Sequence, residues 1–202
     1  MKVISKHLYI QEYAACYKNM LIEAKKSPSC PDQIWSLEHE PVITIGKSAD
    51  SSSILNSKGL PIMETDRGGK VTYHGPGQLV VYTIINYRSL KISPRMLVTK
   101  LEQSMIEFLA SKGLTGSRRA GAPGVYIDNK KIGSIGLRFG KNFSYHGMAF
   151  NLNMDLSPFN QIHTCGYRDL EVTQLANFNS NVGMMECATE LRSILINLIY
   201  NS

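Results

Sequence analysis

Apolar residues recur every three or four positions in three parts of the chain, and this spacing predicts three amphipathic helices. The first pattern covers residues 10–24. The second begins at Ser93-Pro94, where serine suits the helix cap and proline the first helical position, and it ends near Gly113. The third covers residues 185–199. The pattern therefore places helices near both ends of the chain and one in the middle.

Short apolar runs between these helices predict β-strands. The predicted strands are residues 34–37, 42–45, 71–73, 79–85, 124–127, 131–137 and 145–152. The run at 79–85 is almost continuously apolar, so we expect it near the centre of a sheet. Pro41 makes continuous strand pairing between the first two runs unfavourable. The order helix, strands, helix, strands, helix predicts an α+β domain with a mixed or antiparallel sheet.

A hairpin is predicted where Asp128-Asn129-Lys130 separates two strands, because this composition is typical of a turn. Successive side chains of a strand point to opposite faces. Lys131 therefore shares a face with Gly133 and Ile135, whereas Lys130 belongs to the turn. We expect Lys131 to point inward.

Composition favours one soluble globular domain spanning residues 1–202, with 43% hydrophobic and 19% charged residues. No apolar run approaches the ~20 residues that cross a bilayer, and the first twelve residues lack a secretory pattern. These features predict a cytoplasmic protein without membrane association.

The formal net charge of +6 favours acidic partners. The basic residues occur as short pairs, such as Arg118-Arg119, and no aromatic-basic pattern typical of nucleic-acid binding accompanies them. The four cysteines are widely spaced, without metal-ligand spacing, so we expect free thiols and no metal.

The segment from Arg67 to Gln78, Arg-Gly-Gly-Lys-Val-Thr-Tyr-His-Gly-Pro-Gly-Gln, combines four glycines with several polar side chains. Glycine allows the main chain to approach a ligand closely or to turn sharply. A simple Gly-Pro turn between strands is the alternative. Because an apolar run follows at once, we favour a binding site carried on a sheet.

Cys165 is the best candidate nucleophile, because it lies in the polar, glycine-containing stretch at residues 162–167. Cys16 and Cys187 fall in predicted helices, where cysteine usually acts as a small buried apolar residue, and Cys30 lies in a Ser/Pro loop.

A reactive thiolate needs a positive neighbour, and the candidates are His163, Lys131, Lys130 and His74. His74 is equally compatible with a base and with a hydrogen-bonded residue that stabilises its loop. These residue types alone indicate a thiol-dependent acyl transferase or hydrolase.

Several segments together closely resemble the lipoyl(octanoyl) transferase family, also called octanoyl-acyl-carrier-protein:protein N-octanoyltransferase. They are residues 67–78, Lys-Ile-Gly-Ser-Ile-Gly-Leu-Arg at 131–138, His-Gly-Met-Ala-Phe-Asn-Leu-Asn at 146–153, Met-Asp-Leu-Ser-Pro-Phe at 154–159, and Cys165-Gly166.

The resemblance implies the fold of the biotin and lipoate protein ligases and a reaction in two steps. Octanoyl would move from acyl carrier protein to the enzyme cysteine and then to a lysine of an acceptor domain. The implied acceptors are the lipoyl domains of 2-oxoacid dehydrogenase complexes and the glycine cleavage H protein. No cofactor is implied.

By position, Cys165 corresponds to the acyl-thioester nucleophile and Lys131 to the lysine that lowers its pKa and handles protons. The residues implied to line the acyl site are Arg67, Gly68, Gly69, Lys70, Val71, Thr72, Tyr73 and His74, then Ser134, Ile135 and Gly136, and finally Gly147, Met148 and Ala149. Either Lys131 or His74 could remove the proton of the acceptor lysine.

Two positions depart from the family pattern. Lys70 stands where an acidic residue is usual, and His163-Thr164 replaces Asn-Pro before Cys165. We expect the acyl chain to bind in an apolar slot floored by glycine and walled by Ile, Met and Phe, where full burial of its methylene groups is worth about 5 kcal/mol.

Three other functions fit parts of the pattern. An ATP-dependent lipoate or biotin protein ligase shares the fold but needs no thiol nucleophile. A thioesterase-like hydrolase would use the same cysteine and release free octanoate. A carrier-protein binding module without catalysis would account for the positive charge and leave Cys165 dispensable.

Overall fold

The computed structural model describes residues 3–26, 29–49, 56–162, 170–178 and 183–201. Its main element is a mixed six-stranded sheet with the order β1-β2-β6-β9-β8-β7. The strands are β1 (Ile4–Gln11), β2 (Gln33–His39), β6 (Gln78–Ile84), β9 (Ser144–Asn151), β8 (Lys130–Phe139) and β7 (Gly124–Ile127). Only the β1–β2 pair is parallel among these described strands, and the rest of the sheet is antiparallel. The predicted α+β class with a mixed sheet is confirmed.

A smaller sheet has the order β4-β3-β5 and is made of β4 (Ile62–Glu64), β3 (Val42–Ile45) and β5 (Val71–His74). Pro41 separates β2 from β3, as predicted, and the two strands belong to different sheets. β5 leads through Gly75-Pro76-Gly77 directly into β6. The glycine-rich segment therefore connects the two sheets.

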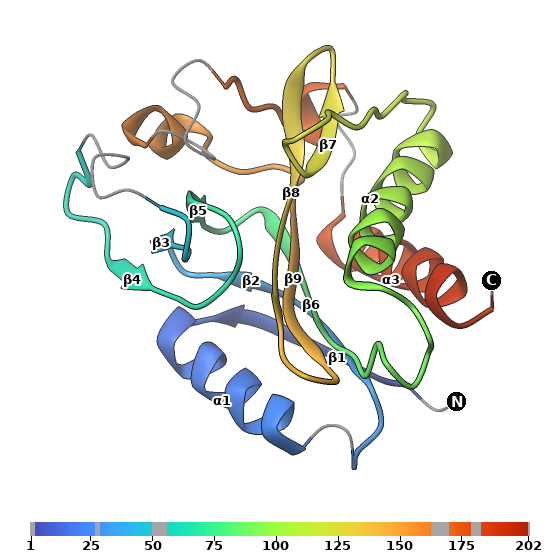
Figure 1. The fold of residues 1–202 in the computed structure, drawn as a ribbon. Coiled ribbons are helices and arrows are strands. Elements are labelled where there is room, and N and C mark those ends of the chain that lie inside the picture. Colours follow the sequence, from blue (N-terminus) through green and yellow to red (C-terminus); the bar gives the residue numbers. More distant parts are fainter. Residues whose placement is uncertain (1–2, 27–28, 50–55, 163–169, 179–182, 202) are drawn as a thin grey trace.

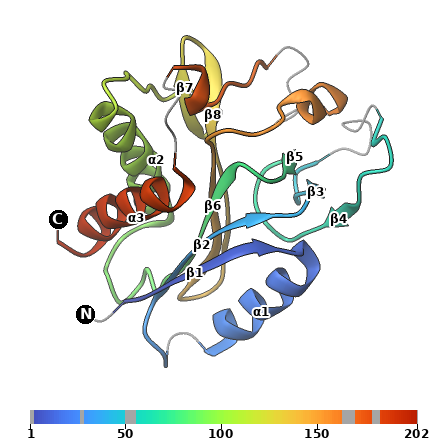
Figure 2. The ribbon, with the colours of Figure 1, turned by 180° about the vertical axis from the view of Figure 1, so that it is seen from behind.

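The helices cover both faces of the large sheet, as Figures 1 and 2 show from opposite sides. α1 (Tyr13–Lys26) lies on one face, and α2 (Pro94–Ser111) and α3 (Met184–Tyr200) lie on the other. The larger apolar core lies between the sheet and α2 and α3, and a smaller one lies under α1. Two short 3₁₀ helices, η2 (Ser157–Gln161) and η4 (Leu175–Asn177), complete the described elements.

The local rules that end helices and turn hairpins hold in three places. Ser93 caps α2, its hydroxyl accepting a hydrogen bond from the Met96 N–H at 3.1 Å, and Gly113 follows the helix with a φ of +76°. Asp128 and Asn129 have positive φ values and form the turn of the β7–β8 hairpin.

Among the described residues, no helix is long and apolar enough to span a membrane.

The predicted start of the first helix at residue 10 is wrong, because residues 4–11 form β1 and α1 begins at Tyr13. Both carboxylate oxygens of Glu12 accept hydrogen bonds from the Ala14 and Ala15 N–H groups at 2.7 Å, so Glu12 caps the helix. β1 was missed because Tyr9 has a φ of +54° and shifts the register, which breaks the alternation expected of a strand. The three-residue β4 was also not predicted.

Candidate active site

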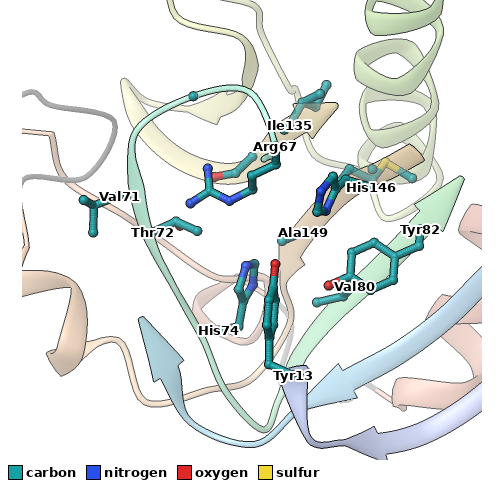
Figure 3. Close-up of a pocket in the computed structure, with 15 residues that line it drawn as sticks. Tyr13, Arg67, Val71, Thr72, His74, Val80, Tyr82, Ile135, His146 and Ala149 are labelled. Atoms are coloured by element: carbon teal, nitrogen blue, oxygen red, sulfur yellow. The ribbon is translucent and has the colours of Figure 1, made fainter. Parts of the chain in front are cut away.

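The first cavity lies against the face of the large sheet that carries α1, beside the glycine-rich segment (Figure 3). It encloses about 510 Å³ of space, part of it open to solvent. Many of its lining residues are ones that the sequence predicts for the acyl site: Arg67, Gly69, Val71, Thr72, His74, Ser134, Ile135, Gly136, Gly147, Met148 and Ala149. The structure therefore gathers three segments that are distant in sequence around one space.

Three predicted acyl-site residues lie elsewhere. Gly68 and Lys70 line a second cavity, and the buried Tyr73 packs against Phe159, with ring centres 5.6 Å apart. Four lining residues were not in the predicted set: Tyr13, Val80, Tyr82 and His146. No phenylalanine is among the described lining residues, so the expected Phe wall is replaced by two tyrosines.

Small side chains on one face of three strands leave the room for this cavity. Ala149 on β9 is paired with Val80 on β6 and with Ser134 on β8. One pair further along, Gly147 is opposite Gly136. A Cβ on Gly147 would lie 2.0 Å from the Val81 carbonyl oxygen, so glycine is required there by backbone approach as well.

Arg67 joins the glycine-rich segment to the smaller sheet. Its guanidinium donates to the Thr44 carbonyl and hydroxyl oxygens at 2.8 Å and to the Gly68 carbonyl at 3.0 Å, and the residue is buried. The positive charge thus lines the cavity while its hydrogen bonds fix the loop.

His74 is a neutral, buried histidine. Its Nδ1 lies 2.6 Å from the Gln78 side-chain oxygen, and the Gln78 amide nitrogen donates to Asn151 at 2.9 Å. In this network Gln78 accepts from Nδ1–H, which leaves Nε2 without its proton. Burial, followed by the nearby His39, lowers the pKa of His74 to about 3. A base with so low a pKa accepts protons weakly at neutral pH.

Aromatic rings extend the His74 environment toward α1. Tyr13 stacks on His74 with ring centres 5.9 Å apart, and His39 lies 5.8 Å from the same histidine. His39 donates to the Gln11 carbonyl at 3.0 Å and accepts from the Tyr82 hydroxyl at 2.7 Å. Burial lowers the pKa of His39 to about 4, so both histidines are neutral at physiological pH.

A second polar group centres on Asp66. It accepts hydrogen bonds from His146 Nε2 at 2.9 Å, from the Tyr17 hydroxyl at 2.8 Å and from the Tyr145 hydroxyl. Burial raises the pKa of this carboxyl, but the three donors together outweigh burial and hold the pKa well below its ordinary value. Asp66 is therefore a carboxylate, and it orients the imidazole that lines the cavity.

His146 is unusual in two respects. It has a φ of +63° within β9, and its buried Nδ1 has no hydrogen-bond partner among the described residues. Burial lowers its pKa despite the hydrogen bond to Asp66. Backbone strain and an unpaired polar atom cluster at functional sites, so His146 joins the candidate residues. From the sequence, His146 and His39 are weaker candidates than His74.

Lys131 points inward, as predicted, and only 2% of it is exposed, although a register shift in the β7–β8 pair breaks the expected regular alternation between Lys131 and Gly133. Its Nζ donates to the Pro123 carbonyl at 2.9 Å and lies 5.4 Å from the centre of the Tyr126 ring. Lys130 instead forms an exposed ion pair with Glu171 at 2.7 Å. A Cβ on Gly124 would come within 2.7 Å of the Lys131 Cε, so a glycine leaves the space that this side chain occupies.

Lys131 is held beside the chain that follows the predicted nucleophile. Its N–H donates to the Glu171 carbonyl at 2.8 Å, and its carbonyl accepts from the Thr173 N–H at 2.9 Å. Cys165 and His163 lie outside the described residues. Of the other cysteines, Cys16 and Cys187 are buried in helices, as predicted, and burial raises the pKa of both thiols.

The second cavity contains Lys131 and lies next to the first. Its lining residues are Ser48, Gly68, Gly69, Lys70, Val98, Gly121, Ala122, Pro123, Lys131, Ile135, Gly136, Leu137 and Phe139. Gly69, Ile135 and Gly136 line both cavities, and we call these three residues the seam. Beside it, Gly68 N–H donates to the Leu137 carbonyl at 2.9 Å, and a Cβ on Gly136 would lie 3.0 Å from the Gly68 oxygen. Glycine thus brings the two segments into close contact between the cavities.

Solved structures with this arrangement of elements include lipoate and biotin protein ligases. A bipartite lipoate protein ligase from Thermoplasma acidophilum matches with a TM-score of 0.76 at 14% identity, covering 99% of this chain and 84% of that one. A biotin protein ligase from Aquifex aeolicus matches with a TM-score of 0.58 at 12% identity, covering 99% of this chain and 70% of that one. The fold is that of the lipoate and biotin protein ligase catalytic domains.

Sequence comparison narrows this class. Residues 12–195 match the family model of the lipoyl protein ligase A/B catalytic domain. An octanoyltransferase of Dechloromonas aromatica is 43% identical over 197 residues, covering 97% of this chain and 96% of the relative, and one of Chromobacterium violaceum is 40% identical over 192 residues, covering 95% and 93%. The chain belongs to the octanoyltransferase family and is an acyltransferase.

Proposed function

We propose that this acyltransferase moves an octanoyl group from acyl carrier protein to a lysine of a lipoyl domain through a thioester on Cys165. The acceptors are the lipoyl domains of 2-oxoacid dehydrogenase complexes and the glycine cleavage H protein. Residues 1–202 act as one catalytic domain in the cytoplasm, where reducing conditions keep the thiol available.

The first cavity takes the acyl chain in this proposal. It is formed by small and apolar residues on three strands, among them Val80, Ile135 and Ala149. Burial of six or seven methylene and methyl groups at ~0.8 kcal/mol each stabilises the bound chain by about 5 kcal/mol. Such a site needs no charged contact to the chain, and its depth sets the preferred length.

The burial of Lys131 beside Glu171 and Thr173 is the observation that carries the catalytic assignment. Cys165 and Glu171 are six positions apart in the sequence, which limits the distance between their Cα atoms to roughly 20 Å. A largely buried ammonium group near a thiol favours the thiolate, because the charges attract strongly where water is excluded. We therefore assign to Lys131 the activation of Cys165.

The chemistry balances without ATP. The Cys165 thiolate attacks the carrier thioester carbonyl, a new C–S bond forms, and the carrier thiolate leaves and takes a proton from Lys131. The acceptor amine then attacks the enzyme thioester, a C–N bond replaces the C–S bond, and neutral Lys131 takes the amine proton. One thioester replaces another in the first step, so positioning and an oxyanion site suffice.

We favour Lys131 over His74 as the base of the second step. His74 already donates from Nδ1 to Gln78, and its pKa of about 3 makes it a weak proton acceptor at neutral pH. In this assignment His74 shapes the cavity wall together with Tyr13.

Intact-mass analysis after mixing the protein with octanoyl-carrier protein tests the proposal. We expect one hydroxylamine-labile octanoyl adduct, absent in Cys165→Ala and retained in the matched variant Cys30→Ala, which removes an exposed thiol. An adduct that persists in Cys165→Ala would contradict it.

The same assay separates the alternatives. A ligase would consume ATP, a hydrolase would release free octanoate without acceptor, and a binding module would form no covalent adduct.

A further inference from the structure

The second cavity has no part in holding the acyl chain, yet it contains Lys131 and meets the first cavity at the seam. We propose, on the basis of the proposed function, that it binds the donor's prosthetic arm: a linear, thiol-terminated chain with two amide groups that ends in a phosphodiester. Lys70 contacts the phosphate, and the thiol end lies beside Lys131.

The charge of the cavity fits such a ligand. Two of its lining residues are lysines, Lys70 and Lys131, and no acidic residue is among the described lining residues. Lys70 is exposed, whereas Lys131 is buried. One cation is thus accessible to a phosphate from solvent, and the other is placed for the reacting end.

The length of the cavity also fits. The Lys131 Nζ would lie 3.2 Å from a Cβ on Gly124, which pairs with Ser134, and at 3.3 Å per residue the lining residue Phe139 lies roughly 16 Å along β8 from Ser134. An arm of thirteen bonds from phosphorus to sulfur spans about 15 Å at the reach of an extended chain. With its sulfur beside the Lys131 ammonium group, its phosphate lies near Leu137 and Phe139. The Gly68 N–H donates a hydrogen bond to the Leu137 carbonyl, and Lys70 follows Gly68 two residues later in the sequence.

The edge of β8 offers partners for the amides of the arm. β7 pairs with β8 from Lys130 to Ser134, and beyond that point the Leu137 carbonyl turns to Gly68 on the same side. Backbone groups of a strand repeat their direction every two residues, so the N–H and C=O of Ile135 share that side. An extended arm can therefore hydrogen-bond to the strand edge in the way of an added strand.

Val98 of α2, Leu137 and Phe139 supply an apolar wall to the same cavity. The branched methyl groups of a pantoyl unit, between the phosphate and the first amide, suit this wall. The acyl chain and the arm then lie on opposite sides of the seam, with the thioester carbonyl between them beside Gly69.

Adduct formation from two octanoyl thioesters tests the assignment. One is octanoyl-phosphopantetheine, and the other is octanoyl-N-acetylcysteamine, which lacks the phosphate and most of the arm. In the wild type we expect a higher kcat/KM for the longer donor. In Lys70→Ala the ratio of the two kcat/KM values should fall roughly tenfold, because one charge-assisted contact is lost.

Lys18→Ala, which removes an exposed lysine of α1, is the matched control and should leave the ratio unchanged. Val98→Trp, which narrows the cavity, should lower the ratio as well. An unaltered ratio in both Lys70→Ala and Val98→Trp would overturn the assignment while leaving the cysteine adduct intact. Absence of any adduct in the wild type would overturn the proposed function and this inference together.

Discussion

The two faces of the same three strands carry opposite kinds of side chain. On the face toward α2, Leu79, Val81 and Phe150 are fully buried and belong to the larger apolar core. On the other face, the neighbouring positions are Val80 and Ala149, and they border the first cavity. The alternation that builds a sheet therefore also decides which face is filled and which is left hollow.

Polar groups follow the same division. The buried polar side chains of α2 are Glu102 and Ser104, whereas the cavity face buries His74, His146 and Arg67. Burying such groups costs free energy, and they are stabilised there by hydrogen bonds to Gln78, Asp66 and Thr44. The comparison teaches that stability comes mainly from one face of the sheet and the binding function from the other.

Phe150→Ala should have the largest effect, and it should act on stability. Truncating this fully buried ring leaves a cavity in the core, so the free energy of unfolding should fall by about 3–5 kcal/mol. Urea denaturation measures it. The preference among acyl chain lengths should not change, and a changed preference would show that the two faces are not independent.

Ala149→Leu should change chain-length preference instead. Three added carbons on the cavity face displace about three methylene groups of the ligand, at ~0.8 kcal/mol each. The kcat/KM for octanoyl donors should therefore fall on the order of 50-fold relative to pentanoyl donors.

Competition between the two donors measures this change, with Ala149→Gly as a control that adds no volume. An octanoyl preference in Ala149→Leu equal to that of the wild type would place the acyl chain elsewhere.

Lowering the pH should reduce the stability of the protein, because two buried histidines on the cavity face are neutral in the folded state. The pKa values of His39 and His74 are lowered to about 4 and about 3, so between pH 6.5 and those values the unfolded chain binds more protons than the folded one. The free energy of unfolding should therefore decrease as the pH is lowered below 6.5, and each histidine should contribute up to about 1.4 kcal/mol per pH unit to this decrease. The stabilisation by the two neutral histidines should be fully present above pH 7.

Denaturant titrations at pH 7, 6 and 5 measure this slope. His39→Gln should remove about half of the histidine contribution. A free energy of unfolding that is flat over this range would contradict the assignment of both histidines as neutral.

Local rules predict the parts of the site that lie within single elements. The turn of the β7–β8 hairpin follows from its Asp-Asn sequence, and the position of residues 67–78 beside a central strand follows from the apolar run after it. These features depend on neighbours within a few residues.

Long-range features could not be predicted in the same way. The contact between Asp66 and His146 joins residues eighty positions apart and depends on a positive φ inside a strand. The division into two cavities depends on the approach of Gly68 to Leu137, again between distant segments. β1 was missed for the related reason that a register shift at Tyr9 interrupts its pattern.

The central claim is that the ammonium group of Lys131 activates the thiol of Cys165. The most direct measurement is the pH dependence of the rate at which a small alkylating agent modifies Cys165, in the wild type and in Lys131→Met, followed by peptide mass analysis. We expect the midpoint to rise by about one pH unit or more when the charge is removed. Identical midpoints in the two proteins would contradict the account.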